Sequence, residues 1–427
     1  MKKAVEIKKC RVCGKKKLIK ILSLGNQFVS NFVATSKEKH VKIPLKLVLC
    51  DSKAGGCGLL QLRHTTPSNL MYHNYWYLSG MNKTMILALA DITKKAEQII
   101  SLKKNDLVLD IGCNDGTLLR NYQTKGIKLI GFDPAKNLLA YSQKGTTKII
   151  NNFFNAKEFQ KEFKEEKAKI ITSIAMFYDL DKPNDFVKDV KKCLDDNGLW
   201  VIQMSYLPLM LEQNAFDNIC HEHIEFYSLT SLENLLKRHE MEVIGVELNN
   251  VNGGSFRTYI KHKRAKIKAL EKEKEKLFEL RDREKKIGLE TKKPYEEFAE
   301  RVNKIKKELV EFIKQENAKG KKIYVYGAST KGNTLLQFFN LNNKLIKAAA
   351  ERNLDKIGKK TTGTLIPIIS EEQARKENPD YFLILPWHFL KEFTEREKEY
   401  LENGGKFIVP LPEPKIIGGF GFEEVLD

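Results

Sequence analysis

The sequence predicts an α/β protein in which a small metal-binding domain precedes two doubly wound sheets. Three observations support this fold class: paired cysteines before residue 60, a strand with a glycine-containing turn near residue 112, and a second such unit from residue 321. Apolar runs that alternate with helical patterns are typical of sheets covered by helices. We expect four segments, at residues 1–67, 68–262 (with a leading helical part, 68–100), 263–320 and 321–427.

Length and composition suit several packed domains. The chain has 427 residues and a hydrophobic content of 42%, which excludes wholesale disorder. It contains no run of roughly 18 apolar residues, so we expect no membrane span. Seven unevenly spaced cysteines do not form a disulfide pattern, and the basic start lacks the apolar core of a signal peptide. These features predict a reduced, cytoplasmic protein.

The net charge of +19 is concentrated near the N-terminus. Residues 1–50 hold thirteen Lys or Arg against only Glu6 and Glu38. Such a positive face attracts a polyanion, either nucleic acid or a phosphorylated substrate. A chain that is rich in lysine throughout gives the same charge without any partner, so composition leaves both interpretations open.

Four cysteines near the N-terminus have the spacing of a structural zinc site. The first pair, "CRVC", has two intervening residues, and the second, "CDSKAGGC", has six. Four thiolates complete a tetrahedral site that holds together a segment with few large apolar groups of its own. His40 and His64 are lesser candidates for a fourth ligand. The predicted zinc ligands are Cys10, Cys13, Cys50 and Cys57.

The segment "DLVLDIGCNDGTLLRNY" is the most informative in the chain. An apolar strand over 107–111 leads into a glycine turn and a predicted helix, and a second strand ends at Asp133. An acid at that place contacts ribose hydroxyls in nucleotide-binding sheets. The turn lacks the glycine spacing of a pyrophosphate site. It resembles motif I of class I S-adenosylmethionine-dependent methyltransferases. The matching residues are Asp110, Gly112, Asn114, Gly116 and Asp133.

Residues 262–320 are dominated by Lys and Glu, and they predict long exposed helices that connect domains. A second α/β unit follows, with strands expected in "KKIYVYGAS", "LIKAAAE", "YFLILPWHF" and, last, "KFIVPLP". Its turn "GASTKGN" has Asn333 where a P-loop needs Lys, which excludes an NTPase. Ser329, Thr330 and Lys331 at the start of the helix in "TKGNTLLQFF" offer a phosphate-binding site, although an ordinary capped turn is the better explanation of this loop taken alone.

The stretch "CHEHIEFYSLTSLENLL", from Cys220, places two histidines and two glutamates before an amphipathic helix. A metal site is disfavoured because no third histidine lies nearby and H-E-x-x-H is absent. A solvated helix entry capped by Ser228 is the simpler alternative. Acid–base chemistry is the third interpretation.

Taken in order, these segments resemble the nucleotide-sugar C-methyltransferases, which act on keto-deoxysugars carried on a nucleoside diphosphate. The phrases "YWYLSGMNKTM", "LDIGCNDGTLL", "CHEHIEFYSL", "VNGGSFRTYI", "YGASTKGNTLL", "ERNLDKIGKKTTGTLIPIIS" and "LILPWHF" extend the resemblance over nearly the whole chain. The family combines a zinc-binding domain, a Rossmann-like methyltransferase domain and a second Rossmann-like domain without a redox cofactor. The wide second cysteine pair departs from its pattern.

The resemblance implies S-adenosylmethionine-dependent methylation of a carbon next to a ketone, such as C3 of a 4-keto sugar. His223 is then the base, and Glu222 is its orienting or electrostatic partner. His221 joins the same face if the segment is extended, and Tyr75 or Tyr77 donates to the enolate oxygen. The remaining expected site residues are Phe132 and Tyr178 for the cofactor, and Arg257, Ser329, Thr330, Lys331, Asn333 and Arg352 for the substrate.

Other functions remain open at this point. They are O-methylation of a sugar or sugar-derived metabolite, methylation of nucleic acid, and a scaffold without catalysis. Only Phe28 and Phe32 offer aromatic rings within residues 1–50, a poor platform for stacking bases. The Pro-Pro acceptor motif of amino-methylating enzymes is also missing, and the intact motif I disfavours a scaffold. We expect a nucleotide-sugar substrate, no nucleic-acid or membrane partner, and a monomer or weak homo-oligomer.

Overall fold

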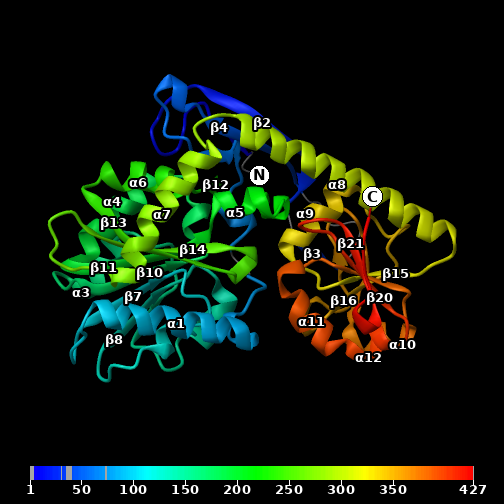
Figure 1. Ribbon diagram of the computed structural model, residues 1–427. Helices are drawn as coiled ribbons and strands as arrows, with labels where there is room; N and C mark the ends of the chain where they lie inside the picture. The colour runs from blue at the N-terminus through cyan, green and yellow to red at the C-terminus, as the bar shows by residue number, and fades with distance from the viewer. Residues whose placement is uncertain (1–3, 30, 35–40, 73–74, 427) are drawn as a thin grey trace.

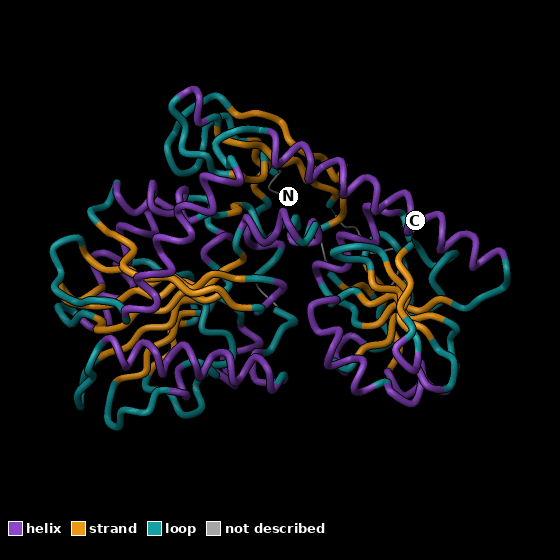
Figure 2. The backbone as a smooth tube through the Cα atoms, viewed as in Figure 1, coloured by secondary structure: helices purple, strands orange, loops and turns teal. Residues whose placement is uncertain are grey.

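The computed structural model describes residues 4–29, 31–34, 41–72 and 75–426. Two α/β lobes lie side by side, and a small β domain together with the long helix α8 (Lys293–Ala318) lies across both of them (Figure 1). In each lobe, helices cover both faces of a central sheet (Figure 2). Among the described residues, no helix combines the length and apolar character that crossing a membrane requires.

The N-terminal domain is built on a four-stranded antiparallel sheet in the order β12-β5-β4-β2. Its strand β12 comes from the histidine-rich stretch, far along the chain from the others. Two short ladders extend the domain, β1 with β6 and β3 with β17. The strands are β1 (Val5–Glu6), β2 (Leu18–Phe28), β3 (Phe32–Val33), β4 (Lys42–Cys50), β5 (Leu60–Leu62), β6 (His64–Thr65), β12 (Glu225–Phe226) and β17 (Lys360–Thr361).

The first lobe contains a seven-stranded sheet in the order β13-β14-β11-β10-β7-β8-β9. The strands from β9 to β11 are parallel, and β14 and β13 are antiparallel. The strand predicted over 107–111 is confirmed, and all five residues are buried, as in a sheet covered on both faces. The strands are β7 (Leu107–Ile111), β8 (Lys128–Phe132), β9 (Lys148–Ile150), β10 (Ala168–Ile174), β11 (Leu194–Ser205), β13 (Met241–Asn249) and β14 (Ser255–His262).

The helix predicted after the glycine turn is wrong, because the chain forms only a 3-10 turn at Leu119–Asn121. The Asn121 Nδ2 donates to the Thr117 carbonyl at 2.9 Å. That carbonyl is the acceptor that the Asn121 backbone N–H would use in an α-helix, so the side chain competes with the helix. The helices of this lobe are α1 (Lys83–Ile99), α2 (Leu139–Ser142), α3 (Ala156–Phe163), α4 (Pro183–Cys193), α5 (Leu207–Glu212), α6 (Leu229–Lys237) and α7 (Glu271–Ile287).

The charged segment forms the two long helices that the sequence predicts, but they are not exposed connectors. Helix α7 packs against β13 through buried Leu277 and Leu280. Helix α8 buries an apolar stripe with the three- and four-residue spacing of one helix face. Its members are Tyr295, Phe298, Val302, Ile305, Leu309 and Ile313. Lys and Glu fill the remaining faces, so the high charge hides a regular apolar stripe.

The second lobe has the sheet order β18-β16-β15-β19-β20-β21-β22, in which the first five strands are parallel. The prediction that "KFIVPLP" is the last strand is wrong, since β21 and β22 follow it. The strand in "YFLILPWHF" ends before Pro386, which cannot donate to a ladder. The elements are β15 (Ile323–Tyr326), α9 (Thr330–Phe339), β16 (Ala349–Glu351), β18 (Ile368–Ser370), α10 (Glu371–Glu377), β19 (Tyr381–Ile384), α11 (Leu390–Arg396), α12 (Lys398–Glu402), β20 (Lys406–Val409), β21 (Lys415–Ile417) and β22 (Glu423–Val425).

One apolar core joins the N-terminal domain to the second lobe. Leu45, Leu47 and Leu60 of the β domain belong to the same buried cluster as the α8 stripe and the β15–β19 strands. The Gln337 side chain pairs with the backbone of Phe28, accepting from its N–H at 2.8 Å and donating to its carbonyl at 3.1 Å. The N-terminal segment therefore has more apolar surface than the sequence led us to expect, and it shares that surface with residues more than 250 positions away.

Candidate active site

A cavity of about 1290 Å³ is lined by both lobes. On the first lobe its wall is formed by the carboxyl ends of β7 and β8, and on the second by those of β15, β16 and β19. Ligands of open α/β sheets bind at this edge. A site for one small molecule encloses roughly 300–1,000 Å³. The cavity therefore has room for two molecules side by side.

The first-lobe wall carries the residues of the glycine turn. The Asp133 carboxylate accepts from the backbone N–H of Asn114 at 2.8 Å and of Ala135 at 2.9 Å, and burial raises its pKa. Asp110 accepts from Thr172 Oγ1 at 2.6 Å, and burial raises the pKa of this carboxyl to about 7. Each carboxylate oxygen of Asp133 accepts only one backbone hydrogen bond, so lone pairs remain for a ligand.

The loop after Tyr75 lies against the same turn. Asn114, in a left-handed conformation with φ 51°, donates from Nδ2 to the Tyr77 carbonyl at 3.0 Å and accepts at Oδ1 from Ser79 N at 3.0 Å. Gly112 has φ 75°, and a Cβ there would lie 3.1 Å from Met176. An open turn at Gly112, an acid at the end of β8 and apolar Phe132 fit a bound S-adenosylmethionine with its ribose toward Asp133.

Replacing Asp133 with Ala tests this placement. We expect S-adenosylhomocysteine to bind about 1–3 kcal/mol more weakly, because the ribose hydroxyls lose a buried charged acceptor. Titration calorimetry measures the change, with Asp106→Ala as the matched control, since Asp106 does not line the cavity. Equal affinities in the two variants would remove Asp133 from the site.

His223 lies in the cavity wall with its tautomer fixed. Its Nδ1 donates to the Asn218 carbonyl at 3.0 Å, because a carbonyl oxygen only accepts. Nε2 is therefore left with its lone pair. The ring packs on Tyr178 with centroids 4.3 Å apart. Burial, reinforced by the nearby charge of Lys331, lowers the pKa of His223 to about 3, so the ring is neutral at working pH.

Glu222 is a second cavity residue, after Asp110, whose pKa falls near neutrality. Burial raises the pKa of its carboxyl to about 7, and the charge of Lys331 opposes the rise. The expectation that Glu222 orients His223 is wrong, since the Asn218 carbonyl makes that hydrogen bond. Both residues line the cavity, which leaves Glu222 as a charge near His223 and not as its hydrogen-bonded support.

The N-terminal sheet holds the histidine-rich stretch in place. The Leu62 N–H donates to the Ile224 carbonyl at 2.8 Å, and β12 continues the ladder with Glu225 opposite Gln61. Beyond β12, Ser228 caps α6 by accepting from the Ser231 N–H at 3.1 Å, as the simpler interpretation of this stretch expects. The catalytic candidates thus sit beside an edge strand of the N-terminal domain.

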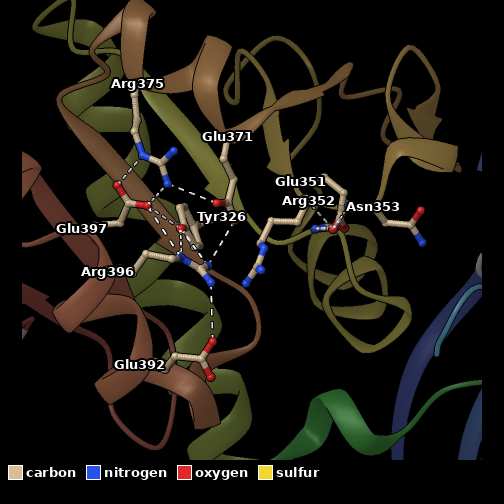
Figure 3. A network of polar contacts seen from close by, with 10 residues as sticks. Tyr326, Glu351, Arg352, Asn353, Glu371, Arg375, Glu392, Arg396 and Glu397 are labelled. Atoms are coloured by element: carbon tan, nitrogen blue, oxygen red, sulfur yellow. Dashed lines mark hydrogen bonds and ion pairs between the residues drawn. The ribbon is translucent and has the colours of Figure 1, made fainter. Parts of the chain in front are cut away.

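The second-lobe wall is a network of Arg, Glu and Tyr (Figure 3). Arg396 donates to the Tyr326 hydroxyl from Nε at 3.0 Å and from Nη2 at 2.8 Å, and also to Glu371 at 3.1 Å. The Glu351 carboxylate accepts from four donors of its own lobe, so it braces the wall. In the described part of the chain, no side chain pairs with the guanidinium of Arg352, which is exposed at the cavity.

The four N-terminal cysteines form one cluster. Their Sγ atoms lie within 4.8 Å of one another, with Cys10–Cys57 at 3.5 Å and Cys13–Cys50 at 3.4 Å. Zn–S bonds of about 2.3 Å place tetrahedral sulfurs about 3.8 Å apart, so the cluster fits such an ion. His64 is not part of the cluster, and His40 lies outside the described residues.

Comparisons with known proteins identify the family of this chain. The C-methyltransferase NovU of Streptomyces niveus is 30% identical over 416 residues, which cover 96% of this chain and 97% of that protein. The chain belongs to the C-methyltransferase family. It is a methyltransferase that depends on S-adenosylmethionine.

Three family models match successive parts of this C-methyltransferase. They are described as "Putative zinc binding domain" at residues 10–72, "Methyltransferase domain" at 81–246 and "C-methyltransferase C-terminal domain" at 250–412. Among solved structures, the plantazolicin methyltransferase BpumL with SAH matches at 16% identity and TM-score 0.34, covering 42% of this chain and 84% of that one. BamL with SAH and a triazolic desmethylPZN analog matches at 13% and 0.32, covering 43% and 87%.

Four residues expected at the site of the C-methyltransferase do not line its cavity. His221 turns to the N-terminal domain, where Nε2 donates to the Ile43 carbonyl at 3.1 Å, because the stretch bends before β12. Gly116 has φ 78° in a tight turn, where a Cβ would meet Arg120 at 2.8 Å, so its role is steric. Asn333 is buried inside α9.

Arg257 is the fourth exception. On β14 it donates to Gln203 at 2.9 Å and to Asp91 at 2.8 Å, and Glu247 lies 3.5 Å from it. The Arg257 side chain is 3% exposed and its Nε donates to Gln203, so it supports Gln203, which does line the cavity. Ser329 lines the cavity but also caps α9, accepting from Gly332 N at 2.9 Å.

The sequence analysis did not predict several titratable residues that line the cavity. Asp217 is 3% exposed; its Oδ2 accepts from Trp387 Nε1 at 3.2 Å, and its Oδ1 has no partner among the described residues. Asp179 and His388 also line the cavity. Asp217 lies three positions before Cys220, and that short spacing was the one local signal available.

Proposed function

We propose that this C-methyltransferase methylates a carbon next to the ketone of a nucleotide-linked keto sugar. The observation that supports this most directly is that Glu222 and His223 share one cavity with the Asp133 turn and with the second-lobe wall. Carbon becomes nucleophilic when a base removes the C–H proton beside a ketone. A cavity with room for two molecules and a neutral imidazole between them suits that chemistry.

His223 is proposed as the base and Glu222 as its electrostatic partner. The Nε2 lone pair accepts the proton, and the Asn218 carbonyl keeps hold of Nδ1–H. The resulting imidazolium is buried, so an ionised carboxylate at Glu222 stabilises it, as an acid does in other histidine sites. Tyr75 and Tyr77 line the cavity as candidate donors toward the substrate. When bound, S-adenosylmethionine supplies the methyl group.

The second lobe is proposed to hold the nucleoside diphosphate. Ala328, Ser329 and Thr330 bring the start of α9 to the cavity, and helix starts bind phosphate oxygens. Arg352 adds a guanidinium group at the same wall, and such a group pairs with phosphate in bidentate geometry, whereas Arg396 is engaged with Tyr326 and Glu371 and shapes the wall.

We also propose that the metal of the cysteine cluster is Zn²⁺, because four thiolates in tetrahedral geometry with no open position are typical of structural zinc. Its role is to fold the domain that holds β12. It takes no part in the reaction, because the cysteines do not line the cavity.

A labelled-methyl assay tests the proposed function. The protein is incubated with thymidine diphosphate 4-keto-6-deoxyglucose and S-adenosylmethionine carrying a ¹³C-methyl group. We expect mass spectrometry to find the label on the sugar and NMR to place the methyl on carbon. A methyl bonded to oxygen would favour the alternative, O-methylation, and label recovered only in added RNA would contradict a sugar substrate.

A further inference from the structure

Lys331 reaches out of its own lobe. It stands in the first turn of α9, yet its Nζ lies 3.5 Å from the carbonyl of Asn252 on the first lobe. Asn252 belongs to the turn Val251–Gly253 between β13 and β14 and has φ 54°. Gly253 in that turn lies against Trp387, where a Cβ would come within 3.2 Å of the indole. The ammonium is thus fixed where the two lobes meet.

The titratable groups near this ammonium include His223 and Glu222, the residues proposed to remove the substrate proton. Burial raises the pKa of Glu222 and Asp217 and lowers that of His223, and the charge of Lys331 acts downward on all three. Burial lowers the pKa of Lys331, and the negative charges of Asp217 and Glu222 act in the opposite direction and favour the ammonium. The side chain of Lys331 leaves the start of α9 toward Asn252, whereas Arg352 offers a guanidinium to the phosphates at the second-lobe wall. The position of Lys331 therefore suits a developing negative charge beside His223.

We propose that Lys331 is a catalytic residue that binds the enolate oxygen of the substrate, a role that rests on the proposed function. As His223 Nε2 takes the proton, the C–H electron pair forms the new C=C bond and the ketone π pair moves to oxygen. The ammonium donates a hydrogen bond to that oxygen and keeps its own protons. A fixed donor of this kind in a site shielded from water stabilises the transition state more than the ketone.

This role assigns part of the chemistry to the second lobe. The Asn252 carbonyl accepts from the ammonium before substrate arrives, so little reorganisation is needed during reaction. The phosphate-binding site predicted from "GASTKGN" is the competing role. A phosphate-binding residue binds the substrate and the transition state equally, so its loss raises KM. Loss of a hydrogen-bond donor to the enolate oxygen lowers kcat.

The first test is exchange of the sugar C–H in heavy water, with thymidine diphosphate 4-keto-6-deoxyglucose at saturation. We expect Lys331→Met to slow exchange by about 10²–10³-fold, as loss of one oxyanion donor does, with KM changed less than threefold. Lys331→Arg should recover part of the rate. Lys347→Met, an exposed lysine of the same lobe outside the cavity, is the control and should behave as wild type.

Each outcome has a distinct meaning. A raised KM with normal exchange at saturation would overturn the enolate role in favour of the phosphate-binding site. Normal exchange with normal KM would also overturn it. If the wild-type protein fails to exchange or methylate the sugar, the proposed function falls, and this inference falls with it.

A second test uses no substrate. Glu222 has a folded pKa of about 7 against an ordinary value of 4.5, so this group lowers the stability of the fold as pH rises from about 4.5 to about 7, and the loss is constant above that. At pH 8 this cost is fully present, and Lys331 offsets part of it. We expect Glu222→Gln to raise the denaturant midpoint more in the Lys331→Met background than in wild type. Equal effects would show that the two groups do not interact and would overturn the placement of the ammonium.

Discussion

His223→Asn is expected to abolish methyl transfer and to slow exchange of the sugar C–H by about 10²–10⁴-fold, the usual cost of losing a general base. Asparagine keeps a donor toward the Asn218 carbonyl but has no basic lone pair. Zinc content should stay at the wild-type value and S-adenosylhomocysteine affinity should change little, since the ring reaches the cofactor residues only through its packing on Tyr178. Full exchange in the variant would move the base to another group.

The pH profile separates His223 from Glu222. His223 is neutral above about pH 3, so its own titration cannot shape the rate near neutrality. Glu222 ionises with a pKa of about 7, so we expect the exchange rate to rise as pH increases through 7. In Glu222→Gln that rise should vanish, whereas Asp110→Asn, which removes the other carboxyl with a pKa of about 7, should keep it. A rise that persists in Glu222→Gln would mean that another group carries it.

Loss of the metal is also expected to remove methyl transfer, but by unfolding the domain that supports the catalytic stretch. Structural Zn²⁺ contributes about 10–16 kcal/mol to the folding of small zinc-finger peptides, so the N-terminal sheet should not close without it. Because β5 of that sheet pairs with β12, the stretch that carries Glu222 and His223 loses its support. We expect Cys57→Ser or strong chelation to lower the thermal midpoint and to remove methyl transfer.

Metal analysis and a matched cysteine variant check this result. The wild-type protein, handled without chelator under reducing conditions, should contain one zinc per chain. Cys193→Ala removes a buried thiol of α4 outside the cluster and should retain both zinc and activity. A metal-free wild-type protein with full activity would contradict the structural role.

Local patterns were sufficient for the elements that depend on near neighbours in the sequence. The strand at 107–111 and the helix at 330–339 are where the sequence places them, because each has a regular apolar pattern bounded by glycine or a capping serine. The turn after Gly116 was misjudged because one side chain, Asn121, takes the acceptor that a helix needs. Propensity does not record such a competition.

Side-chain direction at the site depended on partners that are distant in the sequence. Arg257 looked like a substrate ligand, but Asp91 and Gln203 occupy its guanidinium. His221 is two positions from His223, yet the Ile43 carbonyl draws it to the other domain. Lys331 was assigned to phosphate because of its helix start, whereas its ammonium crosses to Asn252. No spacing rule within one segment contains these contacts.

The core that the N-terminal domain shares with the second lobe also sets an order of events during synthesis. Leu45 and Leu47 leave the ribosome early, but their partners on β15 and β19 follow some 280 residues or more later. At about 5–20 residues per second, the nascent β domain waits many seconds with an apolar face uncovered. We therefore expect fragments that end before residue 320 to be held by chaperones or to aggregate, even when zinc is supplied.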